Sequence, residues 1–149
     1  MLSVKMQNVA VVVLAASNNP RLLNGDFLKR HGVVPDDWVV TDTLVTPPFA
    51  QVTFENGLQV IVEENRLHFR ANSPEKFSWA DELPRIAVAY TKLLPYVNYG
   101  GVGLNFIYKS DSPHGEAAEE AIIQMLLKPG PWLECNSGIT GVVLDLQYR

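Results

Sequence analysis

The chain has 149 residues, of which 47% are hydrophobic and 19% charged, and 12 Lys and Arg against 16 Asp and Glu give a formal net charge of −4. This length and apolar content suffice for one ordinary core, which excludes disordered, collagen-like and coiled-coil classes. The charge balance argues against nucleic acid as a partner, because phosphate binding draws on clustered Lys and Arg. We therefore expect a single domain over residues 1–149.

An apolar, valine-rich run over residues 9–16 has two interpretations. Branching at the β-carbon favours an interior strand that is buried on both faces. The run also resembles the apolar region of a signal peptide, in which case residues 1–17 would be removed and the protein would be secreted or periplasmic. We expect the strand and a cytoplasmic protein, because Lys5 is the only positive charge before the run. The run is too short to cross a membrane, so no membrane partner is expected.

Turn and cap residues divide the next stretch. Asn19-Pro20 is typical of a helix start, and Asn24-Gly25 then breaks the chain before a short helix expected over residues 26–31. Residues 38–46 are rich in Val and Thr, which favours a strand that ends at Pro47-Pro48.

Two hairpins are predicted between residues 50 and 71. A two-residue turn at Asn56-Gly57 would put the apolar residues of the flanking strands on opposite faces, whereas a three-residue loop with Gly57 in the left-handed conformation puts them on one face. A second turn at Glu64-Asn65 leads into the next strand and puts its apolar residues on the same face. The pattern therefore predicts a three-strand meander over 50–55, 58–63 and 66–71. Its shared buried face comprises Val52, Phe54, Val60, Val62, Leu67 and Phe69.

Apolar residues at helical spacing predict a helix over 84–94, with Pro84 in its first turn. The sequence Tyr99-Gly100-Gly101 predicts a turn into a strand over 102–109. We interpret these glycines as a turn rather than a phosphate loop, because they precede a strand and not a helix. A capped helix over 113–128 and a last strand over 139–148 complete the chain.

These elements predict an α+β fold with a mainly antiparallel sheet of about five to seven strands, two main helices and one short helix. The tight hairpins and the helices on one sheet face favour this class. A ferredoxin-like core with extra strands is one compatible topology.

No catalytic motif is found. The three histidines, His31, His68 and His114, lack the spacing that places two metal ligands on one helix face, and the single cysteine, Cys135, is interpreted as an incidental thiol. We therefore expect no metal and no cofactor. A lone cysteine is compatible with the reducing cytoplasm.

One group of polar residues is a candidate binding site. Arg66, His68 and Arg70 alternate along one predicted strand, so their side chains project from one face, with Gln59 beside them on the neighbouring strand. Such a row can receive a carboxylate or phosphate, or it can be a solvated sheet face. The two arginines are expected to lower the pKa of His68 unless Glu63 or an anion compensates.

The sequence favours a non-enzymatic protein that associates with itself or with another protein. Its support is the high apolar content, together with Trp38, Trp79 and Trp132 near segment ends, where aromatic side chains act as interface anchors. The alternative is a protein or enzyme that binds a small anion at Arg66, His68, Arg70 and Gln59.

Overall fold

The structure, a computed structural model, describes residues 3–111, with side chains over 5–109. Residues 5–109 form one compact unit. The elements in chain order are β1 (Ser3–Ala16), the 3-10 helix η1 (Pro20–Leu22), α1 (Gly25–Arg30), β2 (Val40–Thr46), β3 (Phe49–Phe54), β4 (Leu58–Glu63), β5 (Arg66–Ala71), α2 (Trp79–Leu93) and β6 (Asn98–Asp111). The predicted helix over 113–128 and strand over 139–148 lie outside the described residues.

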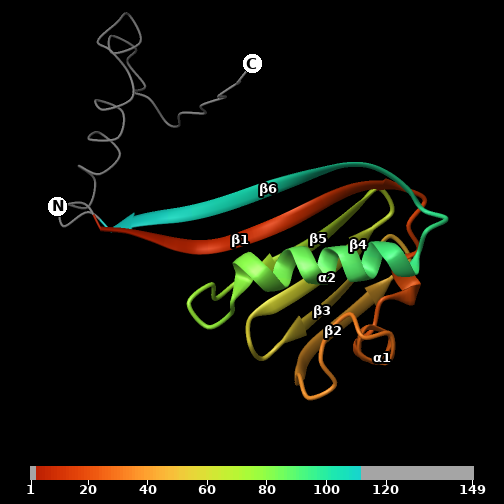
Figure 1. Cartoon of the computed structure of the whole chain (residues 1–149), viewed down its shortest axis with the longest axis horizontal. Coiled ribbons are helices and arrows are strands. Elements are labelled where there is room, and N and C mark those ends of the chain that lie inside the picture. The colour runs from red at the N-terminus through yellow and green to blue at the C-terminus, as the bar shows by residue number, and fades with distance from the viewer. Residues whose placement is uncertain (1–2, 112–149) are drawn as a thin grey trace, which may run out of the picture. The chain divides into compact units, whose positions relative to one another are not determined.

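The strands form one six-stranded sheet in the order β2-β3-β4-β5-β1-β6. Neighbouring strands are antiparallel, and α2 lies across one face (Figure 1). This confirms the α+β class and the mainly antiparallel sheet. The four strands β4-β5-β1-β6 also have the order and connectivity of a ferredoxin-like core, to which β2 and β3 add an extension on one side.

The meander has the predicted register. Val52 pairs with Val60, and Val60 pairs with Phe69 on the next strand. Gly57 has a φ of 90°, a left-handed conformation that favours glycine, as the three-residue loop requires. The six residues predicted to share a buried face are all at most 2% exposed.

Strand β1 lies between β5 and β6, which confirms the predicted interior position. The prediction that it is buried on both faces holds only in part. On the face towards α2, Val9, Val11 and Val13 are buried; on the other face Ala10 is buried but Leu14 is 55% exposed. No helix covers that second face within the described residues, so larger apolar side chains there remain in contact with water (Figure 1).

The short helices begin at asparagine caps. Asn19 accepts a hydrogen bond from the Arg21 N–H at 3.1 Å, and Asn24 accepts one from the Phe27 N–H at 2.8 Å. Helix α1 covers Gly25–Arg30, one residue earlier than predicted, because the Asn24 side chain caps the helix before Gly25. Strand β2 begins at Val40, two residues later than expected.

Helix α2 begins at Trp79 and not at Pro84, so the predicted start was wrong by five residues. Pro84 lies inside the helix, where its ring removes one backbone donor. The acidic first turn contains Asp81 and Glu82, which interact favourably with the positive end of the helix dipole. This signal for an earlier start outweighs the preference of proline for the first turn.

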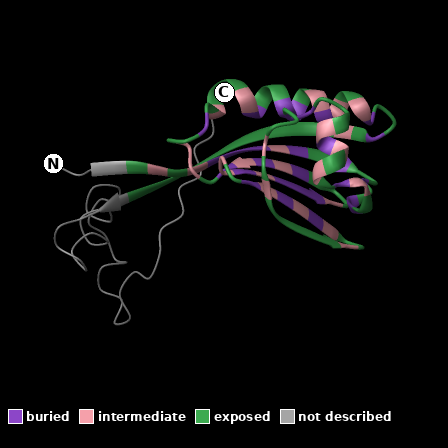
Figure 2. Cartoon of the chain, turned by 90° about the horizontal axis from the view of Figure 1, so that it is seen from below, coloured by how far each residue is buried: buried purple, intermediate pink, exposed green. Residues whose placement is uncertain are grey.

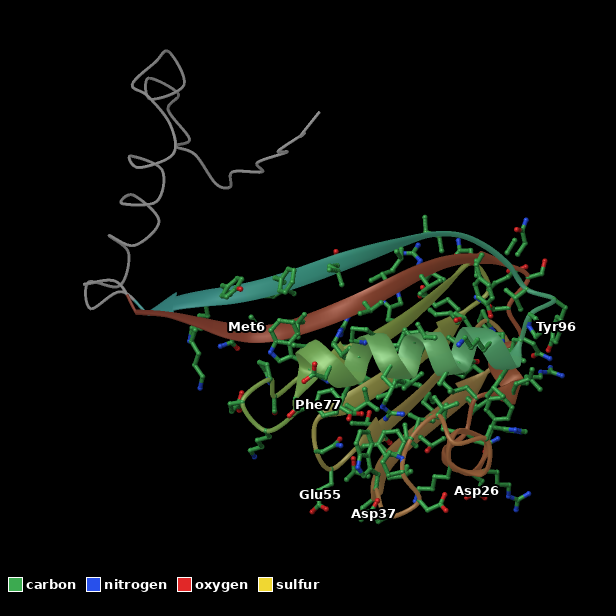
Figure 3. The ribbon with its side chains drawn as sticks, viewed as in Figure 1. Met6, Asp26, Asp37, Glu55, Phe77 and Tyr96 are labelled. Carbon is green, nitrogen blue, oxygen red and sulfur yellow. The ribbon has the colours of Figure 1, made fainter. Side chains whose placement is uncertain are left out.

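Strand β6 also differs from the prediction. It begins at Asn98, and Gly100 and Gly101 are part of the strand rather than a turn. The turn lies earlier, where the Val97 N–H bonds to the Leu94 carbonyl at 3.1 Å. Pro95 falls in this turn and is the residue that separates α2 from β6. Figure 3 labels Phe77 and Tyr96 near the two ends of α2.

The core lies between α2, α1 and the meander. Figure 2 shows buried residues along the meander strands and on the side of α2 that faces them, whereas β6 is exposed. Trp38, predicted as an interface anchor, packs against the core instead, with its ring 5.9 Å from Phe54 and 5.7 Å from Phe77. Trp132 lies outside the described residues. Over the described part of the chain, no helix is long and apolar enough to span a membrane.

Candidate functional site

The polar row lies on the sheet face opposite α2. Arg66, His68 and Arg70 alternate with the buried residues of β5, and Gln59 on β4 is the register partner of Arg70. The structure therefore brings together the four side chains that the sequence singled out. On the other side of β5, Ala10 of β1 is the register partner of Arg70.

The carboxylate of Glu63 lies beside Arg66 and His68, at one end of this row. Its carboxylate oxygen Oε2 lies 3.0 Å from the Arg66 Nε and 3.6 Å from the His68 Nε2. The first distance is that of a charge-assisted hydrogen bond, and the second is too long for one. Arg66 is therefore paired with a carboxylate of its own chain.

Arg70 is in a different position. Its Nε atom is buried and has no hydrogen-bond partner. The amide nitrogen of Gln59, its neighbour, is 3.4 Å from the Thr53 hydroxyl oxygen, on the side away from Arg70. A buried donor without an acceptor is unfavourable by about 1–3 kcal/mol. The guanidinium of Arg70 is thus the group in this row with an unpaired N–H donor, which an incoming acceptor could satisfy.

The pKa of His68 is lowered from its usual 6.5, as the sequence predicts, but the main cause differs. Burial contributes most, because it disfavours the charged imidazolium. Glu63 acts in the opposite direction, and Arg70 and Arg66 then lower the pKa further. His68 is therefore largely neutral at pH 7.

This lowered pKa predicts that His68 makes the stability depend on pH. The unfolded chain binds the proton more readily than the folded one, so this contribution is complete above pH 6.5 and is lost as the pH falls towards the folded pKa. Between about pH 7.5 and about pH 5.5, wild type should lose more free energy of unfolding than His68→Gln. Denaturant unfolding at both pH values measures this. Equal losses of unfolding free energy for wild type and His68→Gln over this pH range would contradict the assignment.

A second candidate site is an apolar groove of about 620 Å³ on the helix side of the sheet. Helix α2 packs against β5 and leaves β6 uncovered, whereas Val11 and Val13 of β1 are buried at the floor of the groove. The lining residues come from β1, α2 and β6: Val11, Val13, Pro84, Ala87, Val88, Thr91, Tyr99, Gly100, Gly101, Val102 and Leu104.

The hydroxyl groups of the two polar side chains that line this groove are already hydrogen-bonded. The Thr91 hydroxyl donates within α2 to the Ala87 carbonyl at 2.9 Å, and the Tyr99 hydroxyl donates to the Leu94 carbonyl at 3.1 Å. Gly100 and Gly101 contribute no side chains to the groove wall. The groove therefore offers apolar surface and no free side-chain donor from these two residues, which suits another apolar surface better than a polar substrate.

Sequence reasoning missed this groove because it depends on how far α2 extends across the sheet. The available signal was the alternation of Val102, Leu104 and Phe106, which gives the predicted strand one apolar face. The structure leaves these side chains 72%, 61% and 44% exposed, although the Trp79 ring lies 5.9 Å from Phe106.

The remaining sequence candidates are placed as follows. His31 ends α1 and its ring lies 4.8 Å from that of Phe27, whereas His114 and Cys135 lie outside the described residues. Among the side chains that the structure describes, no cluster of three His, Cys, Asp or Glu has the geometry to hold a metal ion. Comparisons of the chain with protein-family models, with curated proteins and with solved structures find no match.

Proposed function

We propose that this protein acts by association with a second copy of itself, through the β6 edge of its sheet, rather than by catalysis. The observation that carries the proposal is the contrast between the two edges of the described sheet. An unpaired edge strand presents a row of backbone donors and acceptors that another strand can pair with, so proteins protect the edges that must stay single.

The β2 edge has such protection. It has 7 residues against 14 in β6, it carries the charged residue Asp42, and its register with β3 shifts between Val40 and Asp42. Pro47-Pro48 follows directly and cannot donate backbone hydrogen bonds. Each of these features disfavours pairing with a further strand.

The β6 edge differs in composition between Asn98 and Tyr108. This stretch contains no charged residue and no proline. Large apolar side chains are exposed on both of its faces, Leu104 and Phe106 on the groove side and Ile107 on the other. A long, apolar and uncharged edge favours association with another strand.

Antiparallel pairing of β6 with β6 of a second copy supports a closed dimer. Two identical antiparallel strands are related by a two-fold axis, and such isologous contacts are the commonest in soluble homo-oligomers. A stable interface buries about 1,200–2,000 Å² in total, more than backbone pairing of two strands supplies. The exposed apolar side chains of β6 and the adjoining groove provide further surface next to the same edge.

The mass of the full chain in solution tests this proposal. We expect light scattering at micromolar concentration to give twice the chain mass of 16.6 kDa. Dilution should shift the mass towards the single chain, as mass action requires. A mass of 16.6 kDa at every concentration would contradict the proposal.

A further inference from the structure

We infer that the sheet face opposite α2 binds a small organic carboxylate, with its carboxylate group on Arg70 and its apolar chain over the neighbouring residues towards His68. This site is independent of the β6 edge, which lies on the other side of β1 from β5. The inference rests on four observations, which concern the free donor, the paired neighbours, the net charge and the apolar surface.

The free donor belongs to Arg70. Its Nε is buried without a partner, whereas the Arg66 Nε is 3.0 Å from Glu63. A carboxylate accepts two parallel hydrogen bonds from one guanidinium, which satisfies the orphaned Nε and adds a terminal N–H. The short side chain of Ala10, across from Arg70, does not obstruct this approach.

The charge of the row fits a monoanion. Arg66 and Arg70 supply two positive charges and Glu63 supplies one negative charge, so one positive charge remains while His68 is neutral. A phosphate dianion would need a second free cation, and the only other arginine of the row is already paired. A carboxylate therefore matches this site better than a phosphate.

Apolar surface continues from Arg70 along the strands. His68 is flanked by its register partners, Val12 on β1 and Ile61 on β4. Val12 is partly exposed on this face, whereas Ile61 is only 7% exposed, so Val12 supplies most of the apolar surface. Successive side chains on one face of a strand are about 6–7 Å apart, so an aliphatic chain of about five carbons on the Arg70-bound carboxylate reaches Val12.

The test uses hexanoate as the probe, with acetate and inorganic phosphate as comparison ligands at matched ionic strength. The reporter is the His68 imidazole resonance in proton–carbon spectra of the full chain. We expect a saturable shift with hexanoate, a weaker effect with acetate and the weakest with phosphate. Stronger binding of hexanoate than of acetate tests the apolar contact, and stronger binding of acetate than of phosphate tests the preference for a monoanion.

Two matched variants test the residue assignment. Arg70→Gln should weaken hexanoate binding at least about tenfold, as expected for loss of a charged hydrogen bond, whereas Arg66→Gln removes a charge but no contact to the carboxylate and should weaken binding less. Arg70→Lys keeps the charge but not the forked donors and should bind more weakly than wild type, which makes the test independent of whether Arg70→Gln folds. Equal loss in Arg66→Gln and Arg70→Gln, tighter binding of phosphate than of hexanoate, or no saturable shift would each overturn the inference.

Discussion

Leu104→Lys is expected to raise the dissociation constant of the dimer about 100-fold or more, which corresponds to about 2.7 kcal/mol. Leu104 lies on the unprotected β6 edge and is 61% exposed in the single chain. A lysine at this position would bring two positive charges together across a two-fold interface, and like charges at an interface are unfavourable by several kcal/mol. Lysine is also a residue that natural proteins use to block edge pairing.

The matched control is Leu44→Lys on the opposite edge. Leu44 belongs to β2 and is 49% exposed, so the two substitutions change the same atoms at similar exposure. Sedimentation over a dilution series gives the dissociation constant of each variant, and thermal unfolding shows whether each is folded. Two results would contradict dimer formation through the β6 edge. One is an equal dissociation constant for Leu44→Lys and Leu104→Lys, and the other is a dissociation constant for Leu104→Lys that equals that of wild type.

Phe69→Ala is expected to lower the free energy of unfolding by about 3–5 kcal/mol. Phe69 is fully buried on β5, between its register partners Val11 and Val60. Its ring lies 5.7 Å from that of Tyr90 in an edge-to-face contact with α2. Removing the ring leaves a cavity where the sheet and the helix meet, and the surrounding strands cannot close it without breaking their pairing.

The control for this substitution is Phe49→Ala. Phe49 lies on β3 at a position whose side chain faces away from the core, and it is only partly buried. We expect a loss of about 1 kcal/mol, typical of substitutions outside the core. Denaturant unfolding should be compared at one fixed protein concentration, because dimer formation makes stability depend on concentration. Similar losses for Phe69→Ala and Phe49→Ala would show that the assigned faces are wrong.

The meander was predictable because two independent constraints agree there. The alternation of apolar residues and the position of Gly57 select the same loop length, and a shift by one residue would turn every apolar side chain to the other face. The register of Val52 with Val60 therefore follows from local sequence. The polar row was predictable for the same reason, since alternation along β5 fixes which side chains project together.

Other features depend on tertiary context that the local pattern does not contain. Pro84 suggested a helix start, but the helix extends back to Trp79. Gly100 and Gly101 suggested a turn, but they extend β6 along β1. Alternation gives β6 an apolar face but does not say what covers it, and in the structure that face is largely exposed. The pairing of Glu63 with Arg66 does follow from the predicted turn at Glu64-Asn65, which places the two residues opposite each other. The burial of the Arg70 Nε without a partner depends instead on how the neighbouring strands pack, which alternation alone does not give.

Hydrogen exchange of the β6 backbone amides, measured on the full chain at two concentrations, tests the proposed association most directly. At the concentration where the dimer forms, we expect the outward amides between Asn98 and Tyr108 to exchange slowly, because they bond to the second copy. Dilution below the dissociation constant should make them exchange fast, while the amides of β2 stay unchanged. Exchange of β6 that is the same at both concentrations, or concentration-dependent protection of β2 instead, would contradict the account.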